Sequence, residues 1–208
     1  MPPKVLLSPE RYNSVHIRSR GYLPHWELDD AVYFITYRLQ DSLPRHVLAC
    51  LDQDSQTIIR LVTRGNKPTA IQNAEIRRLV GLRIDQDLDL GYGACHLRNG
   101  DAADAVIENL HHFDGRLYEL LVWCVMPNHV HVMVRLFRGD DLDKMLHSWK
   151  SYTANRVNTI VGRQGPLWER EYFDRTIRGA EDFVDTRAYV LNNPGKAGLQ
   201  NWRWVGER

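Results

Sequence analysis

Two histidines separated by a single residue stand in a stretch whose polarity alternates strictly. His129 and His131 fall on one side of the segment 125–134, and the valines at positions 130, 132 and 134 fall on the other. A period of two is that of a β-strand, so both imidazoles should point from one face. Imidazole nitrogen commonly binds divalent metals. The pattern therefore indicates a strand that supplies two metal ligands, although surface histidines or a buried, hydrogen-bonded histidine would give the same spacing.

A tyrosine and an asparagine share one face of a predicted C-terminal helix, which should begin near Gly179 and end at 193–195. Tyr189 and Asn193 are four residues apart, a spacing that brings side chains together on a helix. Two imidazoles and an amide oxygen leave a metal with open positions for a phosphate oxygen. A phenol has a pKa near ~10 and needs a nearby cation to be a good nucleophile at neutral pH. Facing the histidines, this pair could attack a phosphodiester and form a covalent phosphotyrosine.

Two features of this site have alternatives within the sequence. Asn192 offers an adjacent amide, and Pro194 disfavours helical geometry at Asn193, so the last helical turn could be irregular. Tyr152 lies in another predicted helix with an asparagine three residues further on, and is a second candidate nucleophile. The amide at i+4 favours Tyr189, and we expect Tyr152 to pack or to contact nucleic acid.

Strand and helix periodicities divide the chain into elements of one mixed domain. Strands are predicted over 32–39 and within 117–136, where the second stretch is interrupted at 126–128. Pro127 cannot donate a ladder hydrogen bond, which indicates a bulge or an edge position. The acidic stretch 85–90 lacks the glycine and the glutamate of a calcium loop and is interpreted as a solvated linker. Helices are predicted over 44–62, 70–82, 101–112, 142–161 and 179–193.

Composition limits the class of protein without naming a ligand. The 208 residues are 43% hydrophobic and carry a net charge of +1, from 27 basic and 26 acidic residues, so bulk charge neither indicates nor excludes a nucleic-acid partner. The three cysteines are far apart, which argues against a disulfide framework or a zinc knuckle and fits a reducing cytoplasm. Neither a membrane-spanning run nor a signal-peptide core is evident. We expect a soluble intracellular protein.

Basic and aromatic side chains gather near the N-terminus. Aromatic rings can stack on bases while arginines hold phosphates. An N-terminal arm that packs its rings on the core would have the same composition. The residues concerned are Arg18, Arg20, Tyr22, His25 and Trp26.

Five stretches along the chain resemble a known family. The histidine strand is similar to the His-hydrophobic-His signature of the HUH single-strand DNA endonucleases. More narrowly, the chain resembles the REP-associated tyrosine transposases, relatives of the single-tyrosine transposases of small insertion sequences. The resemblance covers most of residues 18–200, and its motifs are RGYLPHW at 20–26 with MPNHVHV at 126–132, then WKSYTA at 149–154, WEREYFDRTIR at 168–178 and YVLNNPGKAG at 189–198.

The resemblance implies an α+β, ferredoxin-like HUH fold. Its central sheet should be mainly antiparallel, with the histidine strand near the centre, helices on its face, and a C-terminal helix that carries the catalytic Tyr189. The whole chain, 1–208, should be one domain with a helical elaboration at about 44–100. The resemblance also implies that His129, His131 and Asn193 bind Mg²⁺ or Mn²⁺. Gly195 departs from the larger apolar residue common in relatives.

The implied function is metal-dependent nicking and rejoining of single-stranded DNA beside hairpins of repeated extragenic palindromes (REP), through a 5′-phosphotyrosine. We expect a cytoplasmic, nucleoid-associated monomer or homodimer. The alternative is a catalytically retired protein that only binds DNA hairpins; an RNA-processing nuclease is less favoured, because chemistry through a 2′-hydroxyl needs no tyrosine. Residues expected to contact DNA are Arg18, Arg20, Tyr22, His25, Trp26 and Lys150.

Overall fold

Five antiparallel strands form the central sheet of the computed structural model, which describes residues 16–20, 23–27, 31–137, 139 and 141–208. The histidine strand β5 is the middle strand, as predicted, and the sheet and its helices confirm the α+β class. β5 pairs with β3 on one side and β4 on the other, both antiparallel. The strand order is β6 (Phe173–Thr176), β3 (Val32–Arg38), β5 (His129–Leu136), β4 (Tyr118–Val125) and β7 (Val205–Glu207).

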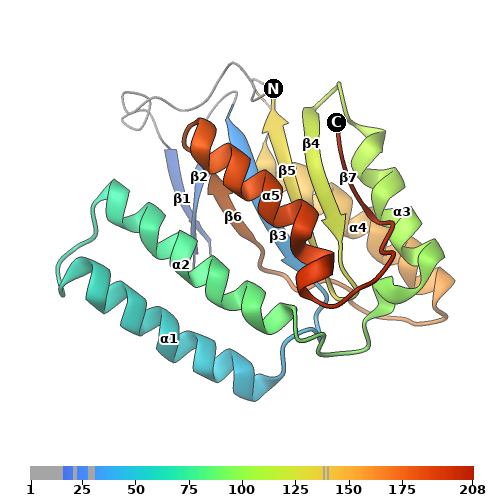
Figure 1. Cartoon of the computed structure of the whole chain (residues 1–208), viewed down its shortest axis with the longest axis horizontal. Coiled ribbons are helices and arrows are strands. Elements are labelled where there is room, and N and C mark those ends of the chain that lie inside the picture. The colour runs from blue at the N-terminus through green and yellow to red at the C-terminus, as the bar shows by residue number, and fades with distance from the viewer. Residues whose placement is uncertain (1–15, 21–22, 28–30, 138, 140) are drawn as a thin grey trace.

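Alternation along the strands gives the sheet two buried faces. The β5 valines join a core cluster with α3 (Gly100–His112) and α4 (Leu142–Ile160). Met133, which shares the histidine side of β5, joins a second cluster with α5 (Ala180–Lys196). Figure 1 shows α5 in front of the sheet and α4 behind it. Helices therefore cover both faces, and the histidines point toward α5.

The remaining helices lie between β3 and β4 in the chain, in the region 44–100. α1 (Arg45–Thr63) and α2 (Ala70–Leu88) share a small core of their own with Leu43, and a short 3-10 helix, η2 (His96–Arg98), follows them. Thr69 caps α2 in a reciprocal pair of hydrogen bonds with Gln72. None of the described helices combines the length and apolar character that a membrane span needs.

Two sequence predictions about local structure were wrong. The stretch 85–90 is not a solvated linker, because α2 continues to Leu88 and Asp85 and Asp87 are buried. Pro127 marks neither an edge strand nor a bulge. It lies in the tight connection between β4 and β5, where Met126 N–H donates to the His129 carbonyl at 2.8 Å, while the register shift occurs within β4. A hairpin connection tolerates proline for the same reason an edge does: no ladder donor is needed there.

Short strands at the sheet edges and near the N-terminus were not predicted. β6 lies within the stretch 168–178, which is rich in aromatic residues and arginines, and β7 lies near the C-terminus. Part of the N-terminal segment forms a separate two-stranded sheet of β1 (His16–Arg20) and β2 (Leu23–Glu27).

A buried arginine ties α2 to the edge of the central sheet. Arg77 Nη1 donates to the Asp174 carbonyl at 2.8 Å and lies 3.5 Å from its carboxylate Oδ1, and both side chains are buried. Removing one partner of a buried ion pair is costly, because the other charge has lost its solvation.

We expect Arg77→Met to lower the free energy of unfolding by about 3–5 kcal/mol. The neighbouring Arg78 pairs with Glu75 at the surface, so Arg78→Met should cost only about 0–1 kcal/mol. Urea unfolding of the two variants compares them directly. Equal losses would show that the Arg77 contact does not hold α2 on the sheet.

Candidate active site

The two histidines are fully buried side by side in the middle of the sheet. Their Nε2 atoms are 3.0 Å apart, so the rings meet through these atoms. The Nδ1 atom of each ring has a separate partner: His131 contacts Thr36 Oγ1 at 2.8 Å across the β3–β5 ladder, and His129 contacts Asn128 Oδ1 at 2.7 Å. Both rings are thus held in fixed orientations by groups outside the pair.

The orientation of Asn128 determines which nitrogen of His129 carries a proton. Asn128 Nδ2 donates to the carbonyls of Leu88 and Tyr92, at 3.2 and 3.1 Å, which turns Oδ1 toward His129. The His129 Nδ1–H must therefore donate to this oxygen, and the neutral ring keeps its Nε2 lone pair. Burial lowers the pKa of His129 to about 3 and also lowers that of His131. The neutral imidazole is the form that binds a metal.

A glycine supports the loop that orients Asn128. Gly93 follows Tyr92, has φ +86°, and its missing Cβ would lie 2.5 Å from the Asp41 carbonyl oxygen. The turn is tight because Ala94 N–H also donates to the Asp41 carboxylate at 2.8 Å. A side chain at this position would therefore meet both backbone strain and a backbone clash.

We expect Gly93→Ala to lower the free energy of unfolding by about 2–4 kcal/mol, from a left-handed backbone and overpacking. Gly91→Ala is the matched control, because Gly91 has φ +71° with nothing within 4 Å of a Cβ. That variant should lose only about 1–2 kcal/mol. Thermal and urea unfolding measure both, and identical losses would show that the Asp41 contact contributes nothing.

The C-terminal helix brings a tyrosine and an amide to the histidine face. The Tyr189 ring centroid lies 5.4 Å from that of His131, and the Lys196 ammonium lies 4.7 Å above the Tyr189 ring. Asn193 is fully buried, and neither polar atom of its side chain has a hydrogen-bond partner in the described part of the chain. Asn192 is exposed. Of the two amides, Asn193 is the one available within the site, and the helix continues through Pro194 to Lys196 rather than becoming irregular.

The donor set fits a divalent metal with two imidazole ligands and one amide ligand. Two neutral imidazoles converge through Nε2, and the buried Asn193 amide has polar atoms with no partner. A buried polar atom without a partner is rare and needs an explanation such as an ion. Among the described residues, no group of three His, Cys, Asp or Glu side chains is arranged to hold a metal. The Asn193 amide is therefore a candidate third protein ligand.

Comparison with known proteins places this site within a family segment. Residues 101–193 match the family model described as "Transposase IS200 like". The resemblance to the tyrosine transposases is therefore confirmed. The matched segment contains both histidines, Tyr189 and Asn193, and excludes α1 and α2.

Individual relatives are distant. A Haemophilus influenzae protein named as a REP-associated tyrosine transposase is 22% identical over 94 residues, which cover 39% of this chain and 52% of the relative. The chain thus spans about half the length of that relative. A solved REP-associated tyrosine transposase bound to a REP hairpin has a TM-score of 0.44 at 17% identity and covers 90% of this chain and 81% of its own. The structure of a protein named as a transposase from Deinococcus radiodurans has a TM-score of 0.33 at 15% identity. The match covers 85% of this chain and 96% of that protein's chain.

Two acidic residues at the C-terminal end of α2 also reach the histidine site, and sequence reasoning missed both. The Tyr189 hydroxyl donates to Asp85 Oδ2 at 2.9 Å. Asp89, the residue that caps α2, has its Oδ1 4.0 Å from His129 Nε2. Burial raises the pKa of Asp85 to about 7 and that of Asp89 to about 6. Burial and the Asp85 carboxyl together raise the pKa of Tyr189, while the nearby Asn193 amide acts to lower it.

A signal for this extension of α2 was present in the sequence. Apolar residues at 76, 80, 84 and 88 recur every four positions, which continues a helical stripe through the acidic stretch. Such a stripe predicts a helix with one buried side up to Leu88. It does not predict that Asp85 faces Tyr189, because that contact depends on how α2 packs against α5.

The other candidate tyrosines lie away from the histidines. Tyr152 is half-exposed on α4, which covers the opposite face of the sheet. Tyr172 packs against that same opposite cluster, and its hydroxyl donates to Asp143 near the start of α4. Of these three tyrosines, Tyr189 alone shares a face with His129 and His131.

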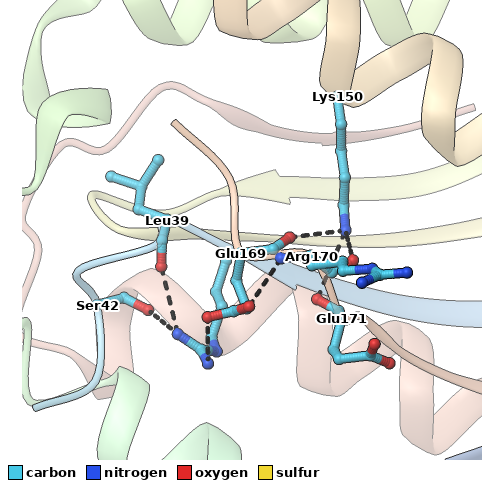
Figure 2. Close-up of polar contacts among 7 residues, drawn as sticks. Leu39, Ser42, Lys150, Glu169, Arg170 and Glu171 are labelled. Atoms are coloured by element: carbon cyan, nitrogen blue, oxygen red, sulfur yellow. Dashed lines mark hydrogen bonds and ion pairs between the residues drawn. The ribbon is translucent and has the colours of Figure 1, made fainter. Parts of the chain in front are cut away.

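Lys150, predicted to contact DNA, holds a segment of the protein backbone (Figure 2). Its ammonium donates to the carbonyls of Glu169 and Arg170, both at 3.1 Å, and of Glu171 at 3.5 Å. Burial lowers its pKa to about 8. In the same region Arg38 Nη2 binds the Glu169 carboxylate at 3.1 Å. Lys150 lies on α4, behind the sheet from the histidines, and DNA contact by this residue stays a prediction.

The other predicted DNA contacts lie on the N-terminal hairpin. Arg18 of β1 stands opposite His25 of β2, and Arg20 and Trp26 belong to the same two strands. β2 contacts β6, at the edge of the central sheet. Tyr22 lies outside the described residues. Nucleic-acid binding by this hairpin stays a prediction.

Proposed function

We propose that this protein nicks and rejoins single-stranded DNA through a covalent phosphotyrosine at Tyr189. One observation carries the proposal: α5 places a tyrosine beside two buried neutral imidazoles, 5.4 Å from the nearer ring, together with an amide that has no partner in the described chain. The elements of this arrangement come from β5 and α5, about sixty residues apart in the sequence. The match to a transposase family over the same segment supports the chemistry.

His129, His131 and Asn193 would hold the metal, Mg²⁺ or Mn²⁺. When bound, the cation supplies charge stabilisation for a phosphate and favours the ionised phenol. The protein prepares this site in advance. Thr36 and Asn128 orient the two rings, and burial keeps both imidazoles in the neutral form.

The Tyr189 oxygen attacks the phosphorus of the DNA backbone, and the 3′-oxygen leaves. The phosphotyrosine keeps the energy of the phosphodiester, so a 3′-hydroxyl can later attack it and restore the strand without ATP. A cleft of about 200 Å³ adjoins Tyr189 and is lined by Phe34, Arg175 and Asp85 among others. The cleft is small and the histidines behind it are buried, so a substrate phosphate requires neighbouring side chains to move. Attack by the tyrosine also requires an accessible, bent DNA backbone, which flexible single-stranded DNA offers and a stacked duplex does not.

The proposed substrate is DNA with a hairpin of the REP type. The curated relative is named for its association with REP sequences, and we extend that association to this chain. Strand cleavage would fall in the single-stranded flank beside the hairpin.

The test uses end-labelled hairpin DNA with a single-stranded flank, incubated with the protein and Mn²⁺, Mg²⁺ or a chelator. Denaturing electrophoresis should show a covalent protein–DNA band and a shortened strand, both dependent on metal. The same sequence as a full duplex should stay intact. Absence of cleavage on every REP-type hairpin, with retained hairpin binding in a mobility-shift assay, would indicate a non-catalytic hairpin-binding protein instead.

A further inference from the structure

Helix α2 contributes a side chain, Asp85, that binds the hydroxyl of the proposed nucleophile Tyr189. We infer that Asp85 is a catalytic base, which holds the Tyr189 hydroxyl and takes its proton as the phenol oxygen attacks phosphorus. This inference rests on the function proposed above. Asp85 precedes the family-matched segment 101–193, so the role falls to a part of the chain that the family match leaves without a function.

The contact has the geometry that proton transfer needs. The Tyr189 hydroxyl donates to Asp85 Oδ2 at 2.9 Å, within the range for a general base and the proton it abstracts. Asp85 is 4% exposed, and its second oxygen has no hydrogen-bond partner among the described residues. The carboxyl is therefore directed at the tyrosine rather than solvated at the surface. Burying a carboxyl group is unfavourable, so its position here calls for a functional explanation.

The surroundings of Asp85 bring its pKa close to neutral pH. Burial is the main influence and raises its pKa to about 7, and Asp89 adds to this effect. The Tyr189 hydroxyl from α5 and Arg175 from β6 act in the opposite direction. A base is most effective when its pKa lies near the working pH, because it is then largely ionised and still a strong acceptor.

A substrate could reach the pair from the cleft that both residues line. Residues of α2, α5, β3 and β6 line this cleft. Figure 1 shows α2 and α5 on the same side of the sheet. Asp85 approaches Tyr189 from α2, while Phe34 of β3 packs edge-on against the tyrosine ring at 6.0 Å. The Asp85 carboxyl group therefore binds the Tyr189 hydroxyl, and both residues line the cleft.

The step balances without any further reactant. The Tyr189 oxygen forms a bond to phosphorus, the bond from phosphorus to the 3′-oxygen breaks, and the phenol proton moves to Asp85. The departing 3′-oxygen takes up a proton from solvent water, and Asp85 returns its own to solvent. In the rejoining reaction the 3′-hydroxyl loses its proton to solvent. Asp85 takes up a proton from solvent again and donates it to the Tyr189 oxygen as this oxygen leaves phosphorus.

The main test is the isosteric change Asp85→Asn, measured by single-turnover cleavage at saturating hairpin DNA and pH 7.5. We expect the rate to fall by about 100-fold or more, the usual contribution of a general base. The Kd for DNA should change less than about twofold, because Asp85 contacts the nucleophile and not the nucleic acid. The Tm should stay equal or rise, because the variant no longer buries a carboxylate. A residue with a purely structural role would lower rate and Tm together.

The matched control is Asp87→Asn, an acid on the same helix whose carboxylate pairs with Arg83 at 2.7 Å. It should cleave at the wild-type rate. A pH series adds a second readout: the wild-type rate should rise with pH as Asp85 ionises and level off above about 7. The rise should be absent in Asp85→Asn. The rate should rise rather than fall with pH, because only the ionised Asp85 carboxylate can accept the phenol proton.

A wild-type rate in Asp85→Asn, or a joint loss of rate and Tm, would overturn the inference while leaving the proposed function intact. If the wild type itself makes no adduct, the proposed function fails first. The contact is then tested without DNA by the Tm values of Asp85→Asn, Tyr189→Phe and the double variant. Additive Tm shifts would show that the two side chains do not interact and would overturn the inference; non-additive shifts would support the contact on which it depends.

Discussion

We expect Tyr189→Phe to yield no covalent protein–DNA adduct, and its cleavage rate should fall by at least about 1,000-fold. The change removes the one atom that forms the bond to phosphorus and keeps the ring that packs on Phe34 and His131. Binding of the hairpin should therefore persist. Gel mobility and denaturing electrophoresis of the same samples separate binding from cleavage.

The controls are the two tyrosines on the other side of the sheet. Tyr152→Phe removes a half-exposed hydroxyl on α4, and Tyr172→Phe removes one that binds Asp143. Both variants should still form the adduct. An adduct that persists in Tyr189→Phe and disappears in Tyr152→Phe would mean that α5 does not carry the nucleophile.

The second large effect is expected at the histidine strand. His131→Asn should lower metal-dependent cleavage by about 100-fold or more, because one of the proposed ligands is lost. A readout without DNA is available, since a metal that binds only the folded protein raises its stability by about 2.7 kcal/mol at 100 times the Kd. For a protein of this length that corresponds to a Tm rise of roughly 5–10 °C. In His131→Asn the Mn²⁺-dependent rise should vanish.

The matched control for the metal is His112→Ala, on the exposed side of α3. It should keep both the Mn²⁺-dependent Tm rise and the cleavage rate. A normal Mn²⁺ response in His131→Asn would exclude this imidazole as a ligand. Loss of the response in His112→Ala would show that the ion binds elsewhere.

The strands and helices that the sequence predicted are those whose patterns are local. Strict alternation through His129 and His131 predicted a strand with two different faces, and caps such as Asn99 before α3 and Asp141 before α4 agree with the expected helix starts. β6 and β7 were missed because each spans only three or four residues and depends on pairing with a distant strand. Short segments of this kind carry too few residues to show a period.

The grouping of Tyr189 and Asn193 with the histidines was expected from the family resemblance, and the geometry brings these side chains together. Their catalytic and metal-binding roles remain proposals. Asp85 was assigned to a solvated linker because the acidic stretch 85–90 lacks the glycine and the glutamate of a calcium loop. Its burial is a tertiary effect, because Asp85 on α2 meets Tyr189 on α5 in a 2.9 Å hydrogen bond. No local pattern reports such a contact.

The central claim is that Tyr189 forms the bond to DNA, and peptide mapping of the covalent adduct tests it most directly. Trypsin should release the three candidate tyrosines on separate peptides, 151–156, 171–175 and 188–196, each containing a single tyrosine. After nuclease digestion of the adduct, mass spectrometry should find the residual nucleotide on peptide 188–196, at Tyr189. A nucleotide on either of the other two peptides, or an unmodified 188–196 peptide in purified adduct, would contradict the account.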